Sequence, residues 1–389
     1  MIRSIYGKTR RSNPEIVKKS YQDLLYAQIS QRFSRLKNPL QDFSTFLNKP
    51  GVISKLANSL PREELTVRVS EGFNSIEFST DDKKLNIKKP ELLWDCICKS
   101  PTETDHENCR IHSHKNGEVI TKNFSKNVKI KYGDFEFYWR NLDSIWPPSI
   151  DSFFFVENII KNTDIINNPA HKIHSVLDIG SGTGFLGIIL TCLIKGVKKL
   201  YLSDWTTTSY LYSTLNWHHN IKEHSDKKNI SYNFLIAANT YWDYLNDIIQ
   251  RKSKFDLVVC NPPYLPIPEE FHELRTEETT AGTELLEHVI QRSKDLGKIT
   301  IIQFSHLAEE SAQKAARKSK IILKPIGKQK LVPFRVPYAL KNKKYMDWLL
   351  DENAEGKKDK WALIRNNHEG SKDMRHKFYH YIQSYIIKS

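Results

Sequence analysis

Long apolar runs are missing from this sequence. No window of its 389 residues approaches 18 consecutive apolar side chains, about the length that a helix needs to cross a bilayer. The first residues, MIRSIYGKTRRSNPEI, include basic side chains but no apolar core after them, unlike a secretory signal. We therefore expect a protein without membrane spans or an export signal.

Cysteine is also scarce. The five cysteines are an odd number in a long chain, which does not indicate a framework of paired disulfides. Together with the missing export signal, they point to a reducing cytoplasm. Internal repeats and long low-complexity linkers are absent as well. A chain of 389 residues is too long for one small core, so we expect two or three domains.

Positive charge is in clear excess. Lys and Arg number 59 against 45 Asp and Glu, which gives a net charge of +14. This excess favours an acidic partner such as RNA, DNA or a ribosome-bound factor. Lys, Asn and Ile are all frequent, so a general lysine enrichment of the source proteome explains the charge equally well. Charge alone does not decide the substrate.

The first 140 residues mix two patterns. Residues 14–36 carry apolar side chains at helical spacing after an Asn-Pro pair, which predicts a helix. Short alternating runs between residues 65 and 98 predict strands, and residues 128–139 read as a hairpin with a Gly-Asp turn. We expect residues 1–140 to form a mixed helical and strand region that recognises the substrate.

Residues 141–336 show a different sequence pattern, in which apolar runs typical of strands alternate with segments of helical periodicity. The predicted strands are HSVLDI, KKLYLS, NFLIAA, FDLVVC and KITIIQF. This alternation predicts an α/β fold, a Rossmann-like, doubly wound and mostly parallel sheet. After one more helix, KIILKP and KQKLVPFRV are expected to close the sheet as a strand pair. Residues 337–389 are expected to be a short basic and aromatic extension, helical at its end.

A glycine-rich turn follows the first of these strands. The segment LDIGSGTGFLG holds Asp178, Gly180, Gly182 and Gly184, and such glycines let a ligand lie against bare backbone before a helix begins. The second strand ends in Asp204, 26 residues after Asp178, where an acid can accept both hydroxyls of a ribose. Dinucleotide-binding enzymes share these features, so they leave a hydride-transfer enzyme open as an alternative.

The segment FDLVVCNPPYLP, residues 255–266, distinguishes the two alternatives. Two consecutive prolines fix two φ angles and remove two backbone donors, so Asn261 and Tyr264 are held in fixed directions at the end of a strand. A hydride-transfer enzyme has no use for such a corner, whereas an N-methyltransferase does. Cys260 just before it is expected to be a buried thiol and not a nucleophile.

On these motifs the sequence resembles the class I S-adenosylmethionine-dependent methyltransferases that carry an NPPY motif and modify a planar NH₂ group. The resemblance covers roughly Asn141 to Val336. It implies S-adenosyl-L-methionine as cofactor. The implied cofactor-binding residues are Asp178, Gly180, Gly182, Gly184, Asp204 and Trp205, and the implied catalytic residues are Asn261, Pro262, Pro263 and Tyr264.

The motif suits a planar amine for a physical reason. The lone pair of an amide or exocyclic amine is delocalised, so the nitrogen is a poor nucleophile. The side-chain carbonyl of Asn261 and the backbone carbonyl of Pro262 can each accept one of its N–H bonds, while Tyr264 stacks on the planar face. Because the sulfonium is a good leaving group, no strong general base and no metal are expected.

Two further segments fit the same family. In WPPSIDSFFFVENII, residues 146–160, Pro148, Asp151 and Ser152 occupy a Pro-x-x-Asp-Thr/Ser step that related glutamine methyltransferases place over the methionine end of the cofactor. A loop and helix that only pack on the sheet remain the alternative. In AANTYWDYL, Asn239 aligns with an acid that contacts the adenine amine, although the neighbouring aromatic residues could flank the adenine instead.

The order of the motifs resembles the HemK-like protein-(glutamine-N5) methyltransferases, which modify a glutamine of peptide-chain release factors. We therefore expect a protein glutamine side-chain amide as the methyl acceptor, the first of three alternatives. The longer N-terminal region and the Trp/Tyr-rich tail depart from that family and suit an adenine or guanine amine in RNA or DNA. A non-catalytic binding module with the same fold is the third alternative, against which the intact motif argues. The expected partner is a macromolecular acceptor: a protein such as a translation factor, or RNA or DNA.

A cluster of cysteines and histidines stands apart from these motifs. Cys96, Cys98, Cys109, His112 and His114 lie in one segment, residues 96–114. Three thiols and an imidazole could hold structural zinc, but the spacing is not one of the standard zinc arrangements. We expect unligated thiols and surface histidines, and no metal.

Overall fold

The chain divides into two compact units, residues 1–61 and 62–389, and every residue that the computed structural model describes belongs to the second. The described residues are 66–69, 76–79, 84–87, 127–132, 135–140, 150–161, 172–204, 207–223, 229–236, 245–246, 248–250, 254–268, 270–271, 282–333, 343–351, 362–365 and 378–388. The predicted helix at residues 14–36 and the cysteine–histidine cluster lie outside them.

A small sheet precedes the α/β region. Its strands are β1 (Thr66–Val69), β2 (Ile76–Ser79), β3 (Lys84–Ile87), β4 (Asn127–Tyr132) and β5 (Phe135–Arg140), in the order β3-β2-β1-β4-β5. The β1–β4 pair is parallel and the other pairs are antiparallel. The short strands and the hairpin predicted from alternation are thereby confirmed.

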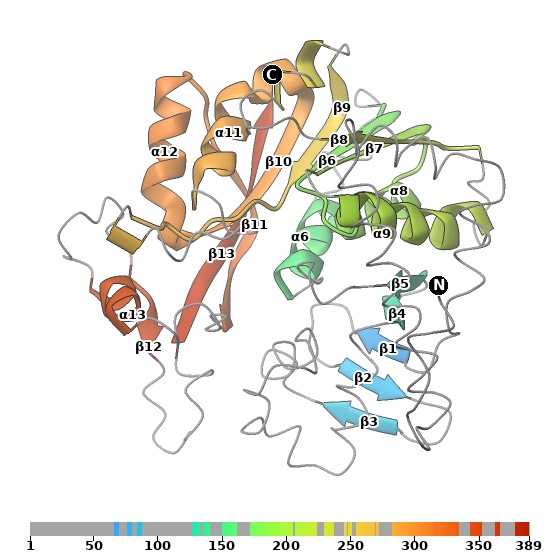
Figure 1. The fold of residues 1–389 in the computed structure, drawn as a ribbon, viewed down its shortest axis with the longest axis horizontal. Coiled ribbons are helices and arrows are strands. Elements are labelled where there is room, and N and C mark those ends of the chain that lie inside the picture. Colours follow the sequence, from blue (N-terminus) through green and yellow to red (C-terminus); the bar gives the residue numbers. More distant parts are fainter. Residues whose placement is uncertain are drawn as a thin grey trace, which may run out of the picture. The chain divides into compact units, whose positions relative to one another are not determined.

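The main sheet has the strand order β11-β13-β10-β9-β6-β7-β8 (Figure 1). Its strands are β6 (Ser175–Ile179), β7 (Lys199–Asp204), β8 (Ser231–Ile236), β9 (Phe255–Cys260), β10 (Gly297–Ser305), β11 (Lys324–Pro333) and β13 (Phe378–Lys388). Strands β6 to β10 pair in parallel. The five predicted strands and the mostly parallel α/β sheet are therefore confirmed.

The C-terminal part of this sheet differs from the prediction. The end of the chain is not helical: β13 lies between β10 and β11 and is antiparallel to both, and β12 (Ile364–Arg365) pairs with its first residues. The expected closing pair is instead the single strand β11, whose register shifts between Ile326 and Lys330. The sheet therefore does not end at residue 336.

Helices cover both faces of the main sheet (Figure 1). They are α6 (Ile150–Lys161), α8 (Phe185–Leu193), α9 (Thr207–Trp217), α11 (Glu284–Leu296) and α12 (Glu309–Lys318). Successive residues of β9 belong to different cores: Val259 lies in the core that includes residues of α6 and α8, whereas Val258 lies in the core that includes residues of α11 and α12. The run FDLVVC is apolar throughout because both faces of β9 are buried.

The strand order also locates the place where a ligand would bind. The chain passes from β6 to β7 and β8 on one side, and then returns to β9 and β10 on the other. In doubly wound sheets, ligands bind outside the carboxyl ends of the strands at this change of direction. Among the helices that the structure describes, none is long and apolar enough to cross a bilayer.

Candidate functional site

The glycine-rich turn leaves β6 in a conformation that side chains would disfavour. Gly180, Gly182 and Gly184 have φ angles of 67°, 52° and 83°, which lie in the left-handed region. At Gly184 an added Cβ would lie 2.7 Å from Leu202 Cδ1. The turn is tied to the next strand because the Ser181 amide donates to the Ser203 carbonyl at 2.9 Å.

Two aspartate side chains accept hydrogen bonds from the turn and from the helix that follows it. Asp204 Oδ2 accepts from the Gly182 amide at 2.8 Å, and Asp178 Oδ2 accepts from the Gly187 amide at 2.8 Å. Burial raises the pKa of Asp178 to about 8 against the opposing effect of the Gly187 hydrogen bond, and the negative charge of Asp204 adds to the rise. The predicted residues of the turn therefore lie together.

The proline corner lies beside the glycine turn. Ile179 at the end of β6 pairs with Cys260 at the end of β9, so Gly180 and Asn261 leave two neighbouring strands at the same edge. Cys260 is fully buried, and burial raises the pKa of its thiol well above the ordinary value. A thiol in this state is a weak nucleophile, as the sequence predicts.

Asp151 meets the proline corner from α6. The Asn261 side-chain nitrogen and the Tyr264 hydroxyl both donate to Asp151 Oδ2, each at 3.4 Å. Asn261 Oδ1 is buried and has no hydrogen-bond partner among the described residues. Because an unpaired buried carbonyl is unfavourable, this oxygen is suited to accept a hydrogen bond from a bound group.

A buried polar chain fixes the backbone of Asp151. Gln303 Nε2 donates to the Asp151 carbonyl at 2.7 Å, Ser384 Oγ donates to Gln303 Oε1 at 3.0 Å, and Asn158 Nδ2 donates to Ser384 Oγ at 3.0 Å. Sequence reasoning missed these residues. The available signal was a glutamine inside the apolar run KITIIQF, because a buried polar side chain needs a partner.

The C-terminal part of the chain supplies two more neighbours. The His380 ring on β13 lies 5.9 Å from the Tyr264 ring, centroid to centroid, and His380 Nδ1 is 2.8 Å from Ser305 Oγ. The helix α13 (Lys343–Leu350) contributes Tyr345, whose hydroxyl donates to the Pro266 carbonyl at 3.0 Å. Neither contact was predicted, because the tail was not expected to join the sheet.

The remaining predicted residues divide into two groups. Ser152 is half-buried in the first turn of α6, Pro262 is buried and Pro263 is half-buried after β9. Trp205 and Asn239 lie outside the described residues. Within the described part of the chain, no group of three or more His, Cys, Asp and Glu side chains is placed to hold a metal ion.

Comparison with known proteins gives a family match. The family model of the methyltransferase small domain matches residues 154–325. A protein of Methanocaldococcus jannaschii, provisionally named a protein N5-glutamine methyltransferase, is 28% identical over 127 residues, which are 32% of this chain and 50% of the relative. The chain thus spans half the length of this curated relative.

Solved structures of methyltransferases resemble the chain only loosely. The human methyltransferase 10 domain containing protein is 14% identical, with a TM-score of 0.35, over 65% of this chain and 89% of that chain. Magnesium protoporphyrin IX methyltransferase from Synechocystis PCC 6803, with bound S-adenosylmethionine, is 13% identical, with a TM-score of 0.33, over 62% of this chain and 81% of that chain. The fold is established by the strand order of this chain itself.

The residues present fit a nucleoside cofactor. The left-handed glycines expose bare backbone at the end of β6, and Asp204 stands at the end of the neighbouring β7. Ser181 Oγ in the same turn is buried without a hydrogen-bond partner in the described residues. Together with the family match and the curated relative, this mostly parallel sheet identifies residues 154–325 as a class I methyltransferase domain, whose cofactor is S-adenosylmethionine.

Proposed function

We propose that the chain is an N-methyltransferase that transfers a methyl group from S-adenosylmethionine to a planar NH₂ group, and that this group is the side-chain amide of a protein glutamine. The observation that carries the proposal is the position of Asn261 Oδ1. This oxygen is buried and lacks a partner among the described residues, and it belongs to the strand end next to the glycine turn.

The Asn261 carbonyl would accept one N–H bond of the acceptor amine, and the Pro262 backbone carbonyl would accept the other. When bound, the cofactor supplies an electrophilic methyl group on a sulfonium. Holding the nitrogen in line with that methyl group makes the step effectively unimolecular. This can lower the reaction barrier by on the order of 7–11 kcal/mol. The ring of Tyr264 would cover the flat face of the amide or base, worth about 1–3 kcal/mol for a stacked base.

Asp151 would keep this arrangement rigid. Its carboxylate accepts from the Asn261 nitrogen, which sets the rotation of the amide and turns Oδ1 away from Asp151. Asp151 Oδ2 also accepts from the Tyr264 hydroxyl, and this contact fixes the Tyr264 ring. Gln303 holds the Asp151 backbone from β10, so the corner is supported by two other elements of the domain.

The choice of glutamine has two supports. The partial relative is named for protein N5-glutamine methylation, and Pro148, Asp151 and Ser152 form the step seen in glutamine methyltransferases. An adenine or guanine amine in RNA or DNA is the second candidate, favoured by the net charge of +14. In either case we propose residues 1–140 as the substrate-recognition region and the cytoplasm as the location.

The test is transfer of label to a complex mixture. The full-length protein is incubated with S-adenosylmethionine labelled in its methyl group and a lysate of the source cells, and the products are then digested. We expect protease to release the label and mass spectrometry to locate it on a glutamine amide. Release of the label by nuclease would identify a nucleic-acid base, and not glutamine, as the methyl acceptor. If the parent protein transferred no more label than the Asn261→Ala variant, methyl transfer itself would be contradicted.

A further inference from the structure

The edge of the main sheet opposite the candidate site carries a row of exposed lysines. Six neighbouring strands each place one lysine there, at or near the strand end. We call this set the lysine row; it comprises Lys199 of β7, Lys172 before β6, Lys254 before β9, Lys298 of β10, Lys388 of β13 and Lys324 of β11. Lys388 ends its strand, but β13 is antiparallel to β10 and β11, so it belongs to the same edge.

The strand register shows that these lysines follow one another along the edge. Lys199 pairs with Ser175 at the start of β6, and Lys388 pairs with Ile299 next to Lys298. Adjacent strands are about 4.8 Å apart, so six strands spread the row over about 24 Å. A nucleic acid strand carries one phosphate per about 3.4 Å of helix axis, and the row is therefore long enough to meet several phosphates.

The helix dipole explains only part of the positive charge at this edge. Lys294 at the end of α11, and Arg317 and Lys318 at the end of α12, lie where cations stabilise a helix terminus. Lys298 follows α11 by two residues, so the end of this helix accounts for part of its placement as well. Lys199 and Lys324 each lie six residues after a helix, beyond its last turn. The helix ends thus account for some of these positive charges, whereas the row continues through six successive strands.

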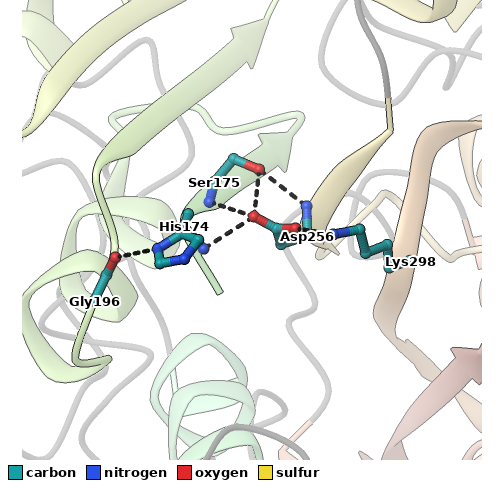
Figure 2. Close-up of polar contacts among 5 residues, drawn as sticks. All are labelled: His174, Ser175, Gly196, Asp256 and Lys298. Atoms are coloured by element: carbon teal, nitrogen blue, oxygen red, sulfur yellow. Dashed lines mark hydrogen bonds and ion pairs between the residues drawn. The ribbon is translucent and has the colours of Figure 1, made fainter. Parts of the chain in front are cut away.

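Carboxylates at this edge already have partners. Asp256 Oδ2 accepts from the amides of His174 and Ser175 and from the Ser175 hydroxyl, while Asp256 Oδ1 pairs with Lys298 Nζ at 2.7 Å (Figure 2). Asp295 pairs with Arg292 at 3.0 Å. Asp256 thus neutralises the charge of Lys298, and its hydrogen bonds link β9 to β6 and β10.

We propose that the lysine row binds the phosphate backbone of a nucleic acid. Phosphate contacts need positive charge and no base-specific groups, and the row offers exposed positive charge along one edge. A strand of six residues such as β9 separates the row from Asn261 by about 20 Å. A bound nucleic acid would therefore leave the carboxyl edge accessible to the methyl acceptor, and the inference does not depend on the proposed reaction.

Binding of fluorescently labelled probes to the full-length protein tests this inference. The probes are a 20-nucleotide single-stranded RNA and a 20-base-pair DNA, titrated at several salt concentrations. The edge variant carries Lys199→Gln, Lys254→Gln and Lys388→Gln. The control variant carries Lys314→Gln, Lys328→Gln and Lys344→Gln, which remove the same charge from exposed sites elsewhere. Circular dichroism melting checks that both variants fold like the parent.

We expect the edge variant to bind at least one probe about tenfold or more weakly than the control variant. Each lost phosphate contact lowers the slope of log affinity against log salt by about 0.7–0.9, so three losses lower it by about 2–3. The preference between RNA and DNA identifies the source of the phosphates. Equal weakening by both variants, or no binding of either probe at 0.1 mM protein, would overturn the proposal. Vesicles of phosphatidylserine are titrated in parallel, and binding to these vesicles alone would overturn the proposal as well.

Discussion

The side-chain nitrogen of Asn261 donates to Asp151 Oδ2 across 3.4 Å, although 110 residues separate the two in the chain. The contact joins the end of β9 to the first turn of α6. It sets the direction of the Asn261 carbonyl, which is the group on which the proposed chemistry depends. The position of one carboxylate on α6 therefore decides how the proline corner is presented.

Removing this carboxylate should slow methyl transfer without unfolding the protein. In Asp151→Ala, both Asn261 and Tyr264 lose their acceptor, and we expect kcat to fall by about tenfold to 100-fold, since a small misplacement of a positioning group has an effect of this size. Asp151→Asn keeps an acceptor oxygen and is the matched control, so its loss should be smaller. Steady-state kinetics compare the two; equal kcat values for parent and Asp151→Ala would show that Asp151 does not position the corner.

Asp204 should contribute to cofactor affinity. An acid at the end of the second strand accepts from ribose hydroxyls, and here it also holds the Gly182 amide. We expect Asp204→Ala to raise the cofactor Kd by about tenfold or more, because a charged acceptor is worth about 1.5–3 kcal/mol. Isothermal titration measures it, with Asp204→Asn as the control that keeps one acceptor oxygen. An unchanged Kd in Asp204→Ala would remove this residue from the cofactor site.

Asp178 should make stability fall as pH rises. Its folded pKa is about 8 against an ordinary value of 3.8, so between about pH 4 and 8 the folded state holds a proton that the unfolded state releases. Stability is therefore lost across this interval as pH increases. Asp178→Asn keeps an acceptor for the Gly187 amide but does not titrate. Urea unfolding at pH 5 and pH 8 should show a smaller loss in the variant, and the same loss in both proteins would refute the raised pKa.

Asp256 should act in the opposite direction. Burial raises its pKa, but the Lys298 ammonium and the donors from His174 and Ser175 outweigh burial and lower it below 3.8 (Figure 2). Its contribution to stability is present above about pH 4 and is lost as pH falls through the folded pKa. We expect Asp256→Asn to reduce the free energy of unfolding by about 1–2 kcal/mol at pH 7. Urea unfolding should show this difference shrink below pH 4; a constant difference would rule out the ionic contribution.

The central strands were predictable because each signal is local. HSVLDI, KKLYLS and FDLVVC are short apolar runs bounded by polar turns, and all three are strands of the main sheet. The glycine turn and the proline corner also depend on neighbouring residues only. Once the strands alternate with helices, both motifs must stand at carboxyl ends, and the pairing of Ile179 with Cys260 puts them side by side.

The C-terminal strand was not predictable in the same way. FYHYIQSYIIK has an apolar stretch that fits a strand or a buried helix, and periodicity alone does not separate the two. Its pairing partners β10 and β11 lie far upstream, so no local turn sets its register. Two strands were predicted where the structure has the single strand β11, because Gly327 interrupts the apolar pattern. Gly327 has a φ of 65° and lies where the register of β11 shifts. Gln303 and His380 were missed for the same reason, since both act through long-range contacts.

The most direct test of the account is methyl transfer by Asn261→Ala beside its cofactor binding. The variant removes the buried Oδ1 atom and leaves the glycine turn intact. We predict that transfer to the acceptor falls by about 100-fold or more, while the Kd for S-adenosylmethionine stays within about twofold of the parent value. Transfer at the parent rate would contradict the account, because the acceptor amine would then be held by some other group.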